Sequence, residues 1–322
     1  MKILVTGGAG YIGSFMVKRL LDDGFEVVVL DSLERGHKDA VDNRAELAVG
    51  NLLDKAFIAE VFSQNAFDGI IHFGGYISVG ESMQKPALYF DNNTEATINL
   101  LEETVARNVK KIIFSSTAAV YGDPERTPID EDHPKNPESV YGESKLMVER
   151  ILKWYQKIHQ MNFVALRYFN ACGAALDGSM GEQHSPETHI IPCAVRAMME
   201  KKPFTLFGTD YNTPDGTCVR DYIHVLDLVE AHILALKHLE KNSGGFFYNV
   251  GTGIGYSNKE VLEMVKKESG ESLEIVTAER RPGDADTLVA DPTRINTELG
   301  FKPQHSDLET IVKSALAWHK RN

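Results

Sequence analysis

Tyr141 and Lys145 place a phenol and an ammonium four positions apart in the sequence SVYGESK, residues 139–145. In a helix, residues at i and i+4 lie on the same face. The charge of Lys145 would then favour the phenolate of Tyr141 and bring proton transfer by the phenol nearer to neutral pH. The same spacing also occurs in helices whose tyrosine is only packed and whose lysine is only solvated. The pair therefore predicts acid–base chemistry only if other elements build a site around it.

The first such element lies at the N-terminus, where the strand-like run 2–6 leads into the sequence GGAGYIG at 7–13 and then into a helical pattern from Phe15 to Leu21. Gly7, Gly10 and Gly13 allow a tight turn, a close approach of the backbone to a pyrophosphate, and close packing of helix on strand. The phosphates would lie on the helix N-terminus. A glycine triplet alone marks only a sharp turn, but this one has the strand and the helix that a dinucleotide site requires.

A second strand-like run, 26–30, ends at Asp31. A carboxylate at this strand end can accept hydrogen bonds from the ribose hydroxyls of an adenosine, and it would repel a 2′-phosphate. The sequence therefore predicts NAD rather than NADP as the cofactor.

Composition narrows the class of protein. The 322 residues are 43% apolar, carry a formal charge of -12 and include three cysteines, Cys172, Cys193 and Cys218. The chain is long enough for two joined lobes. The apolar runs are too short for a membrane span, and we expect no signal peptide. The cysteines are too few and too scattered for a disulfide framework or a metal cluster, so we expect no metal site and a cytoplasmic protein. The negative charge argues against nucleic acid as a partner.

Strand-like and helical runs alternate along the chain. A strand at 69–73, a helix from about Asn93 to Asn108, a strand at 111–115 and an apolar run at 163–169 favour a doubly wound parallel sheet of the Rossmann type. After it, the residues from Ala171 to Thr188 have no clear period and are expected to form a loop. The later elements are shorter and richer in Gly and Pro, which predicts a second, smaller α/β substrate lobe.

In open parallel sheets, ligands lie beyond the carboxyl ends of the strands. We expect one cleft to be formed by the turn 7–13, Asp31, the segments 73–75 and 115–117, and Asn170, which we place at the end of the sixth strand. Thr117 would then reach the same cleft as Tyr141 and bind a substrate oxygen. The alternative is that Thr117 makes only local hydrogen bonds with the backbone.

Several motifs together resemble the extended short-chain dehydrogenase/reductases, and among them most closely the UDP-glucose (UDP-galactose) 4-epimerases. The motifs run through the chain in order and are the glycine turn 7–13, SSTAAVYG at 115–122, YGESK at 141–145, RYFN at 167–170, RDYIHV at 220–225 and RRPGD at 280–284. The resemblance implies an NAD-binding Rossmann domain of residues 1–169 and 222–252, and a UDP-sugar-binding domain of residues 170–221 and 253–322.

The resemblance also implies roles for single residues. Tyr141 would be the acid–base group, Lys145 its electrostatic partner and a ligand of the nicotinamide ribose, and Thr117 the hydroxyl beside the reacting oxygen. The residues expected to bind NAD are Gly7, Gly10, Tyr11, Ile12, Gly13, Asp31, Ser32, Asn51, Leu52, Phe73, Gly74, Gly75, Asn92, Ser115, Tyr141, Lys145 and Tyr168. Those expected to bind the UDP-sugar are Thr117, Tyr141, Asn170, His189, Phe207, Arg220, Arg281 and Asp284.

The implied reaction is reversible C4 epimerisation of a UDP-hexose, UDP-galactose to UDP-glucose, through a transient 4-keto intermediate and with tightly bound NAD. Members of the family usually form homodimers through the helix of Tyr141 and the preceding long helix. The apolar residues Leu100, Leu101 and Val105 permit such a contact here.

Four positions depart from the commonest pattern of the family. Asn51 stands where an Asp usually contacts the adenine, although its amide oxygen can still accept a hydrogen bond. Thr117 replaces a frequent Ser but keeps the hydroxyl, and Ile77 replaces a Lys near the cofactor phosphates. Leu288 lies where side-chain size is thought to decide whether an N-acetyl group fits, so UDP-N-acetylhexosamines remain possible substrates.

The nearest alternatives are other sugar-nucleotide enzymes of the same fold: a UDP-N-acetylhexosamine or UDP-uronate 4-epimerase, a 4,6-dehydratase or a decarboxylase. The last two would need acidic groups after Thr117, where this chain has Ala118 and Ala119. An alternative from another class is a catalytically silent NAD-binding protein. Such a protein could lose Tyr141 or Lys145, and this chain keeps both.

Overall fold

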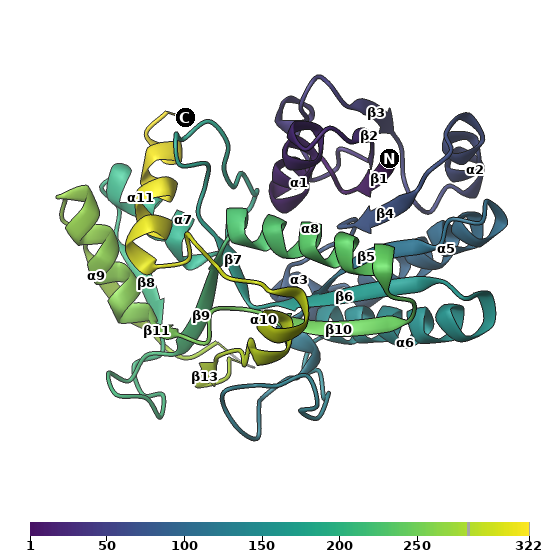
Figure 1. The fold of residues 1–322 in the computed structure, drawn as a ribbon. Helices are drawn as coiled ribbons and strands as arrows, with labels where there is room; N and C mark the ends of the chain where they lie inside the picture. The colour runs from purple at the N-terminus through teal and green to yellow at the C-terminus, as the bar shows by residue number, and fades with distance from the viewer. Residues whose placement is uncertain (282–283, 322) are drawn as a thin grey trace. The chain divides into compact units, whose positions relative to one another are not determined.

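We describe the protein from a computed structural model, which covers residues 1–281 and 284–321 (Figure 1). The chain divides into two compact units. The first comprises residues 1–122, 135–167 and 231–248, and the second comprises residues 123–134, 168–230 and 249–322.

The first unit contains a seven-stranded sheet in the order β3-β2-β1-β4-β5-β6-β10. Its strands are β1 Lys2–Thr6, β2 Glu26–Asp31, β3 Glu46–Val49, β4 Gly69–His72, β5 Lys111–Thr117, β6 Asn162–Tyr168 and β10 Gly245–Val250. The pairs of β1 with β2 and β4, of β2 with β3, and of β4 with β5 are all parallel. Counted outward from β3, the order 3-2-1-4-5-6 is that of a dinucleotide-binding doubly wound sheet. The expected Rossmann-type fold is confirmed.

Helices connect most of the strands of this unit along the chain (Figure 1). They are α1 Tyr11–Asp22, α2 Lys55–Gln64, α3 Val79–Gln84, α4 Pro86–Tyr89, a π-helix Phe90–Glu95, α5 Ala96–Ala106 and α6 Val140–His159, with short 3-10 turns at Lys38–Ala40 and Ala118–Val120. Alternate strand residues such as Leu4, Val28 and Ile70 pack with Leu100 of α5 and Leu152 of α6 in one buried cluster. Their alternation follows from the period of two in a strand, because every second side chain reaches the same face.

The second unit is built around short strands. In one sheet, β9 Val219–His224 pairs with β7 Asn170–Cys172, β11 Gly255–Ser257 and β13 Thr287–Leu288, and in another β8 Phe204–Phe207 pairs with β12 Ile275–Ala278. Its helices are α7 Ile190–Met199, α9 Asn258–Ser269, α10 Thr293–Leu299 and α11 Leu308–His319, and α8 Val225–Lys241 runs from this unit into the first. Buried residues of α7, α9 and α11, such as Val195, Leu262 and Val312, form its core. The second unit is therefore α/β as well.

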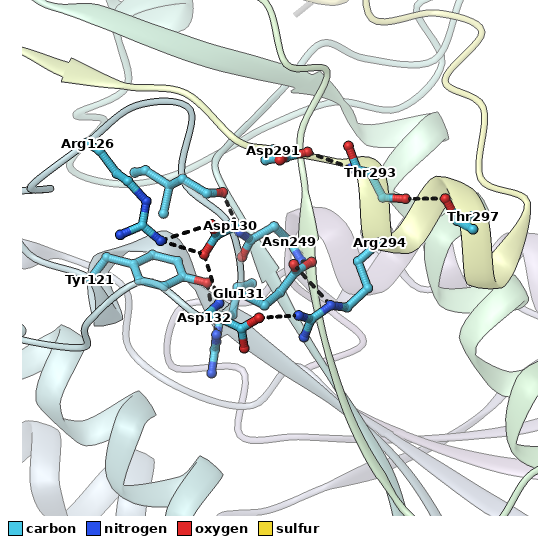
Figure 2. A network of polar contacts seen from close by, with 12 residues as sticks. Tyr121, Arg126, Asp130, Glu131, Asp132, Asn249, Asp291, Thr293, Arg294 and Thr297 are labelled. Carbon is cyan, nitrogen blue, oxygen red and sulfur yellow. Dashed lines mark hydrogen bonds and ion pairs between the residues drawn. The ribbon is translucent and has the colours of Figure 1, made fainter.

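The segment 123–134 belongs to the second unit although it lies between β5 and α6 in the sequence. Ile129 forms a parallel bridge with Ala290. Figure 2 shows Arg294 of α10 beside Glu131 and Asp132, with N–O distances of 3.4 and 2.7 Å. The buried Glu131 also accepts a hydrogen bond from the backbone N–H of Asn249, at 2.8 Å. These long-range contacts hold a loop that local sequence cannot assign to either unit.

Three local expectations are wrong. The helix expected from Asn93 is preceded by the π-helix Phe90–Glu95 and ends at Ala106 rather than Asn108. Asn170 begins β7 instead of ending the sixth strand, because β6 stops at Tyr168. The expected loop therefore starts only after Cys172 and not at Ala171.

None of the described helices is both long and apolar enough to cross a membrane.

Candidate active site

The glycine turn of the first unit needs two of its glycines for steric reasons. Gly7 has a φ of 71°, and a Cβ there would lie 2.7 Å from the backbone nitrogen of Gly74. A Cβ on Gly13 would lie 2.1 Å from the carbonyl oxygen of Gly7. Gly10 is the N-cap of α1, and none of the described side chains caps this helix end. Helix α1, which begins with Tyr11 and Ile12, therefore presents its N-terminal backbone N–H groups to an anion.

Asp31 ends β2 next to this turn. Its buried carboxylate accepts hydrogen bonds from the backbone N–H groups of Ala9, at 3.0 Å, and Leu33, at 2.9 Å. Ser32 follows and its hydroxyl accepts from the N–H of Glu34, at 3.3 Å. Each carboxylate oxygen can accept a further bond, so Asp31 is held in place and still able to bind a ribose hydroxyl.

Asn51 and Leu52 lie after β3. The side-chain oxygen of Asn51 accepts from the N–H of Leu53, at 2.9 Å, and its side-chain nitrogen donates to Glu34 Oε1, at 3.1 Å. Leu52 is buried, and a Cβ on Gly74 would lie 3.2 Å from its Cδ1. The amide oxygen expected to contact an adenine thus already binds the backbone, which fixes its orientation.

The segment after β4 is held by Asn93, a residue that sequence reasoning missed. Its Oδ1 accepts from the N–H of Tyr76 at 2.7 Å, and its Nδ2 donates to the carbonyl of Tyr76 and to Ser144 Oγ, both at 3.0 Å. The neighbouring Asn92 donates to the same Oδ1, at 3.1 Å. A Cβ on Gly75 would lie 3.1 Å from Asn93 Oδ1. Asn93 thereby connects the segment 73–76 to α6, and the π-helix, a form frequent at functional sites, carries it.

Tyr141 and Lys145 lie in the first two turns of α6, which begins after the N-cap Ser139. Both side chains are buried, with 9% of Tyr141 and 2% of Lys145 exposed. Lys145 Nζ donates to the carbonyl oxygen of Ser115, at 3.0 Å. The Thr117 side chain is close enough to the phenol of Tyr141 to lower its pKa. Thr117 Oγ1 accepts from the N–H of Ala119, at 3.1 Å, which is the local backbone bond of the alternative; its contact with a substrate oxygen stays a prediction.

The pKa values of this pair differ from our sequence-based expectation. Burial raises the pKa of Tyr141, and the side chain of Thr117 lowers it in part. Burial also lowers the pKa of Lys145 to about 8. The expected lowering of the Tyr141 pKa by Lys145 is therefore wrong. The physical reason is that desolvation dominates, while the ammonium donates to the Ser115 carbonyl instead of the phenol.

A buried ionic network connects α6, the helix of Tyr141 and Lys145, to the sheet. Arg167 of β6 donates through Nε and Nη2 to the two oxygens of Glu149, at 2.8 and 2.7 Å, and through Nη1 to the hydroxyl of Tyr121, at 2.8 Å. Ser116, which precedes Thr117, donates to Glu149 Oε1 at 2.6 Å. Tyr141, Lys145 and Glu149 are four residues apart on α6, so the same helix face carries the expected acid–base pair and its anchor to the sheet. Sequence reasoning missed Glu149, although its position continues that spacing.

Four of the expected substrate residues of the second unit come together. Arg281 Nε lies 3.0 Å from Asp284 Oδ2, Arg220 Nη2 lies 3.7 Å from Asp284 Oδ1, and the Arg281 guanidinium lies 5.4 Å from the ring centre of Phe207. Phe207 is 38% exposed. Residues 282 and 283 of the motif RRPGD lie outside the described residues. Arg280 instead forms a surface ion pair with Asp210, at 2.7 Å, and we assign it no ligand.

The other expected ligand residues have structural partners of their own. Asn170 Nδ2 donates to the carbonyl of Asp221, at 2.9 Å. His189 Nδ1 lies 2.8 Å from Glu182 Oε1 and 3.0 Å from Glu187 Oε1. Tyr168 is buried at the end of β6, Phe73 packs its ring against His232 with centres 4.8 Å apart, and Leu288 is paired with Arg220 in the register of β13 with β9.

Comparisons with known proteins identify the family of the chain. Residues 3–251 match the NAD dependent epimerase/dehydratase family. The UDP-glucose 4-epimerase of Streptococcus mutans is 50% identical over 322 residues, which cover 99% of this chain and 97% of that protein. The crystal structure of UDP-glucose 4-epimerase from Bifidobacterium longum in complex with NAD+ and UDP is 38% identical, with a TM-score of 0.95 and coverage of 100% and 99%. The structure of the UDP-Glc/GlcNAc 4-epimerase from Campylobacter jejuni is 40% identical, with a TM-score of 0.87 and the same coverage.

The match to the family model spans well over half of the chain, and the relatives align along nearly their whole length. This protein therefore belongs to the NAD dependent epimerase/dehydratase family, in the group whose curated members are UDP-glucose 4-epimerases.

Proposed function

We propose that this protein catalyses the reversible C4 epimerisation of a UDP-hexose, UDP-galactose to UDP-glucose, with tightly bound NAD. The observation that carries the proposal is the burial of Tyr141, Lys145 and Thr117 in the first unit, with the phenol and the ammonium on the same face of α6. The identity of about half of all residues with a UDP-glucose 4-epimerase supports it.

The first unit fits NAD. The uncapped N-terminus of α1 and the glycine turn would hold the pyrophosphate, Asp31 the adenosine ribose, and Lys145 the nicotinamide ribose. A Cβ on Gly75 would lie 3.3 Å from Lys145 Nζ, so a larger residue would crowd this ammonium. When bound, NAD supplies the acceptor and donor of the C4 hydride.

The chain's own residues move the proton. Tyr141, as phenolate, takes the proton of the sugar 4-hydroxyl, and Thr117 holds the same oxygen by a hydrogen bond. The resulting 4-keto sugar turns over and accepts the proton back from Tyr141 when the opposite face is reduced. Since burial raises the pKa of Tyr141, phenolate formation requires positive charge near the phenol. The Lys145 ammonium, and the positive charge of the oxidised cofactor, would provide it.

Binding of the UDP part is proposed for the second unit, through Asn170, His189, Phe207, Arg220, Arg281 and Asp284. Forked guanidinium donors suit diphosphate oxygens. Ala118 and Ala119 cannot transfer protons, which disfavours a dehydratase or a decarboxylase. The proposed domain roles are therefore NAD in the first lobe and UDP-sugar in the second.

One assay tests the reaction. Purified protein incubated with UDP-galactose and no added cofactor should yield UDP-glucose, because the NAD is regenerated in each cycle. A preparation that retains NAD but forms no 4-epimer of any UDP-hexose would refute the proposal. UDP-N-acetylgalactosamine in a parallel sample tests the second candidate, which the similarity to the Campylobacter jejuni enzyme and the intermediate size of Leu288 favour.

We also propose that the protein is a cytoplasmic homodimer. The expected contact residues Leu100 and Leu101 are buried in the core of their own unit, so that part of the expectation is wrong. Trp154 and Ile158, one turn apart on α6, are 59% and 64% exposed and are better candidates. Light scattering of the wild type should give twice the chain mass, and Ile158→Asp should shift it towards the monomer.

A further inference from the structure

Four side chains that can bind a metal ion lie close together in the second unit, just before α7. Glu182, His184, Glu187 and His189 each offer one ligand atom, and these four atoms all lie within 4.8 Å of one another. They occur within eight residues of sequence, so the segment 182–189 alone supplies the whole set.

The shortest distances between these atoms are hydrogen bonds within the cluster. Glu182 Oε1 lies 2.8 Å from the Nδ1 atoms of both His184 and His189, and Glu187 Oε1 lies 3.0 Å from Nδ1 of His189. Two ligands of a tetrahedral ion, each bound at about 2.1 Å, are separated by about 3.4 Å. Each pair would therefore move apart by roughly half an ångström, with loss of the shared proton, to surround a cation.

The two carboxylates are buried in a way that calls for a positive partner. Only 4% of the Glu182 side chain and 3% of the Glu187 side chain are exposed. Glu187 Oε2 has no hydrogen-bond partner among the residues that the structure describes. An unsatisfied buried carboxylate oxygen is costly. A cation bound by Glu187 would remove this cost.

We propose that Glu182, His184, Glu187 and His189 form a binding site for a divalent transition-metal ion of the Zn2+ type. Mixed imidazole and carboxylate ligands suit Zn2+, whereas Mg2+ prefers oxygen ligands alone. The sequence-based expectation of no metal site rested on the cysteines, and the pattern E-x-H-x-x-E-x-H is the signal that it overlooked. The site goes beyond the proposed epimerisation, shares His189 with the proposed UDP-binding residues, and would fix the segment that leads into α7.

Calorimetric titration of the full-length protein with Zn2+, after treatment with a chelator and without any UDP-sugar, tests the proposal. We expect one ion per chain. His184→Gln and Glu187→Gln should each weaken Zn2+ binding by at least about tenfold. Glu263→Gln is the matched control, because Glu263 is an exposed glutamate of the same unit that pairs with Lys266, and it should bind Zn2+ like the wild type. Failure of the epimerase assay would leave this result untouched.

A crystal of the wild type soaked in Zn2+ gives a test that does not depend on folding of the variants. The anomalous signal should lie between the four side chains. Zn2+ bound only elsewhere on the chain, equal Zn2+ affinity in Glu187→Gln, His184→Gln and wild type, or equally tight binding of Mg2+ would overturn the proposal.

Discussion

Tyr141 and Lys145 of the first unit keep 9% and 2% of their surface exposed, whereas Phe207 and the Arg281 side chain of the second unit keep 38% and 51%. The first pair is oriented by buried hydrogen bonds and by Asn93 and Glu149 behind it. The second group is held mainly by its own ion pairs, Arg281 and Arg220 with Asp284. Groups that transfer protons gain from a dry and fixed setting, because electrostatic interactions are stronger there. Groups that bind a charged nucleotide can remain solvated until the ligand arrives.

The sharpest test of this contrast is Tyr141→Phe. We expect the variant to fold and to retain NAD while its turnover falls by about 10²–10⁴-fold, the usual contribution of a positioned acid–base group. Turnover of UDP-galactose and the NAD released on denaturation would be measured together. Tyr155→Phe on the same helix is the control and should turn over like the wild type, because Tyr155 pairs with Glu102 near the surface. Normal turnover in Tyr141→Phe would exclude the phenol as the proton carrier.

The second test breaks the support of the buried site. Arg167→Met leaves the Glu149 carboxylate buried without its partner and should lower the free energy of unfolding by about 3–5 kcal/mol. Urea unfolding would measure the loss. Arg19→Met removes the exposed pair with Asp23 on α1 and should cost less than about 1 kcal/mol. Equal losses in the two variants would mean that burial does not distinguish these pairs.

A third test uses the buried ammonium. The pKa of Lys145 is about 8 in the folded protein and near 10.5 when exposed, so the folded state binds fewer protons than the unfolded chain between these values. The free energy of unfolding should therefore rise with pH through this window, by roughly 1–3 kcal/mol relative to Lys145→Met. Urea unfolding at several pH values, at equal NAD content, measures the difference. Lys153→Met, at an exposed position of α6, should show the same pH dependence of the free energy of unfolding as the wild type. The same pH dependence in Lys145→Met would contradict the pKa shift.

The smallest effect is expected in the exposed group. Arg281→Ala should raise the KM for UDP-galactose and the Kd for UDP by about tenfold with kcat nearly unchanged, because solvent screens this guanidinium before the ligand binds. Arg280→Ala is the matched control, since its guanidinium pairs with Asp210, and it should leave both constants unchanged. A fall in kcat without a change in KM would place Arg281 with the reacting groups instead of the nucleotide.

Residues whose positions depend on local pattern could be predicted from the sequence. The turn at Gly7 and Gly13, Asp31 at the end of β2, and the spacing of Tyr141 and Lys145 are fixed within a few residues of chain. The doubly wound sheet followed from the alternation of strands and helices, and it is confirmed.

Features that depend on distant partners could not be predicted. The pairing of Glu149 with Arg167 and the place of 123–134 beside Ala290 and Arg294 arise only when the chain has folded. Asn93 was missed because a π-helix has no strong sequence signal, although five polar residues in a row, 91–95, interrupt a helical pattern there. The pKa of Tyr141 is raised instead of lowered, because the spacing of residues gives the position of a charge but not the burial of the group beside it.

The pair of Glu149 and Arg167 also constrains how this protein can change over generations. Removing either partner alone leaves a buried charge, so single substitutions at these positions would be eliminated before a second could repair them. Replacement of both at once by apolar residues of similar volume can be neutral for stability. That route would also remove the acceptor of Ser116, the residue next to Thr117. We therefore expect relatives that use the hydroxyl of Thr117 to retain both the glutamate and the arginine.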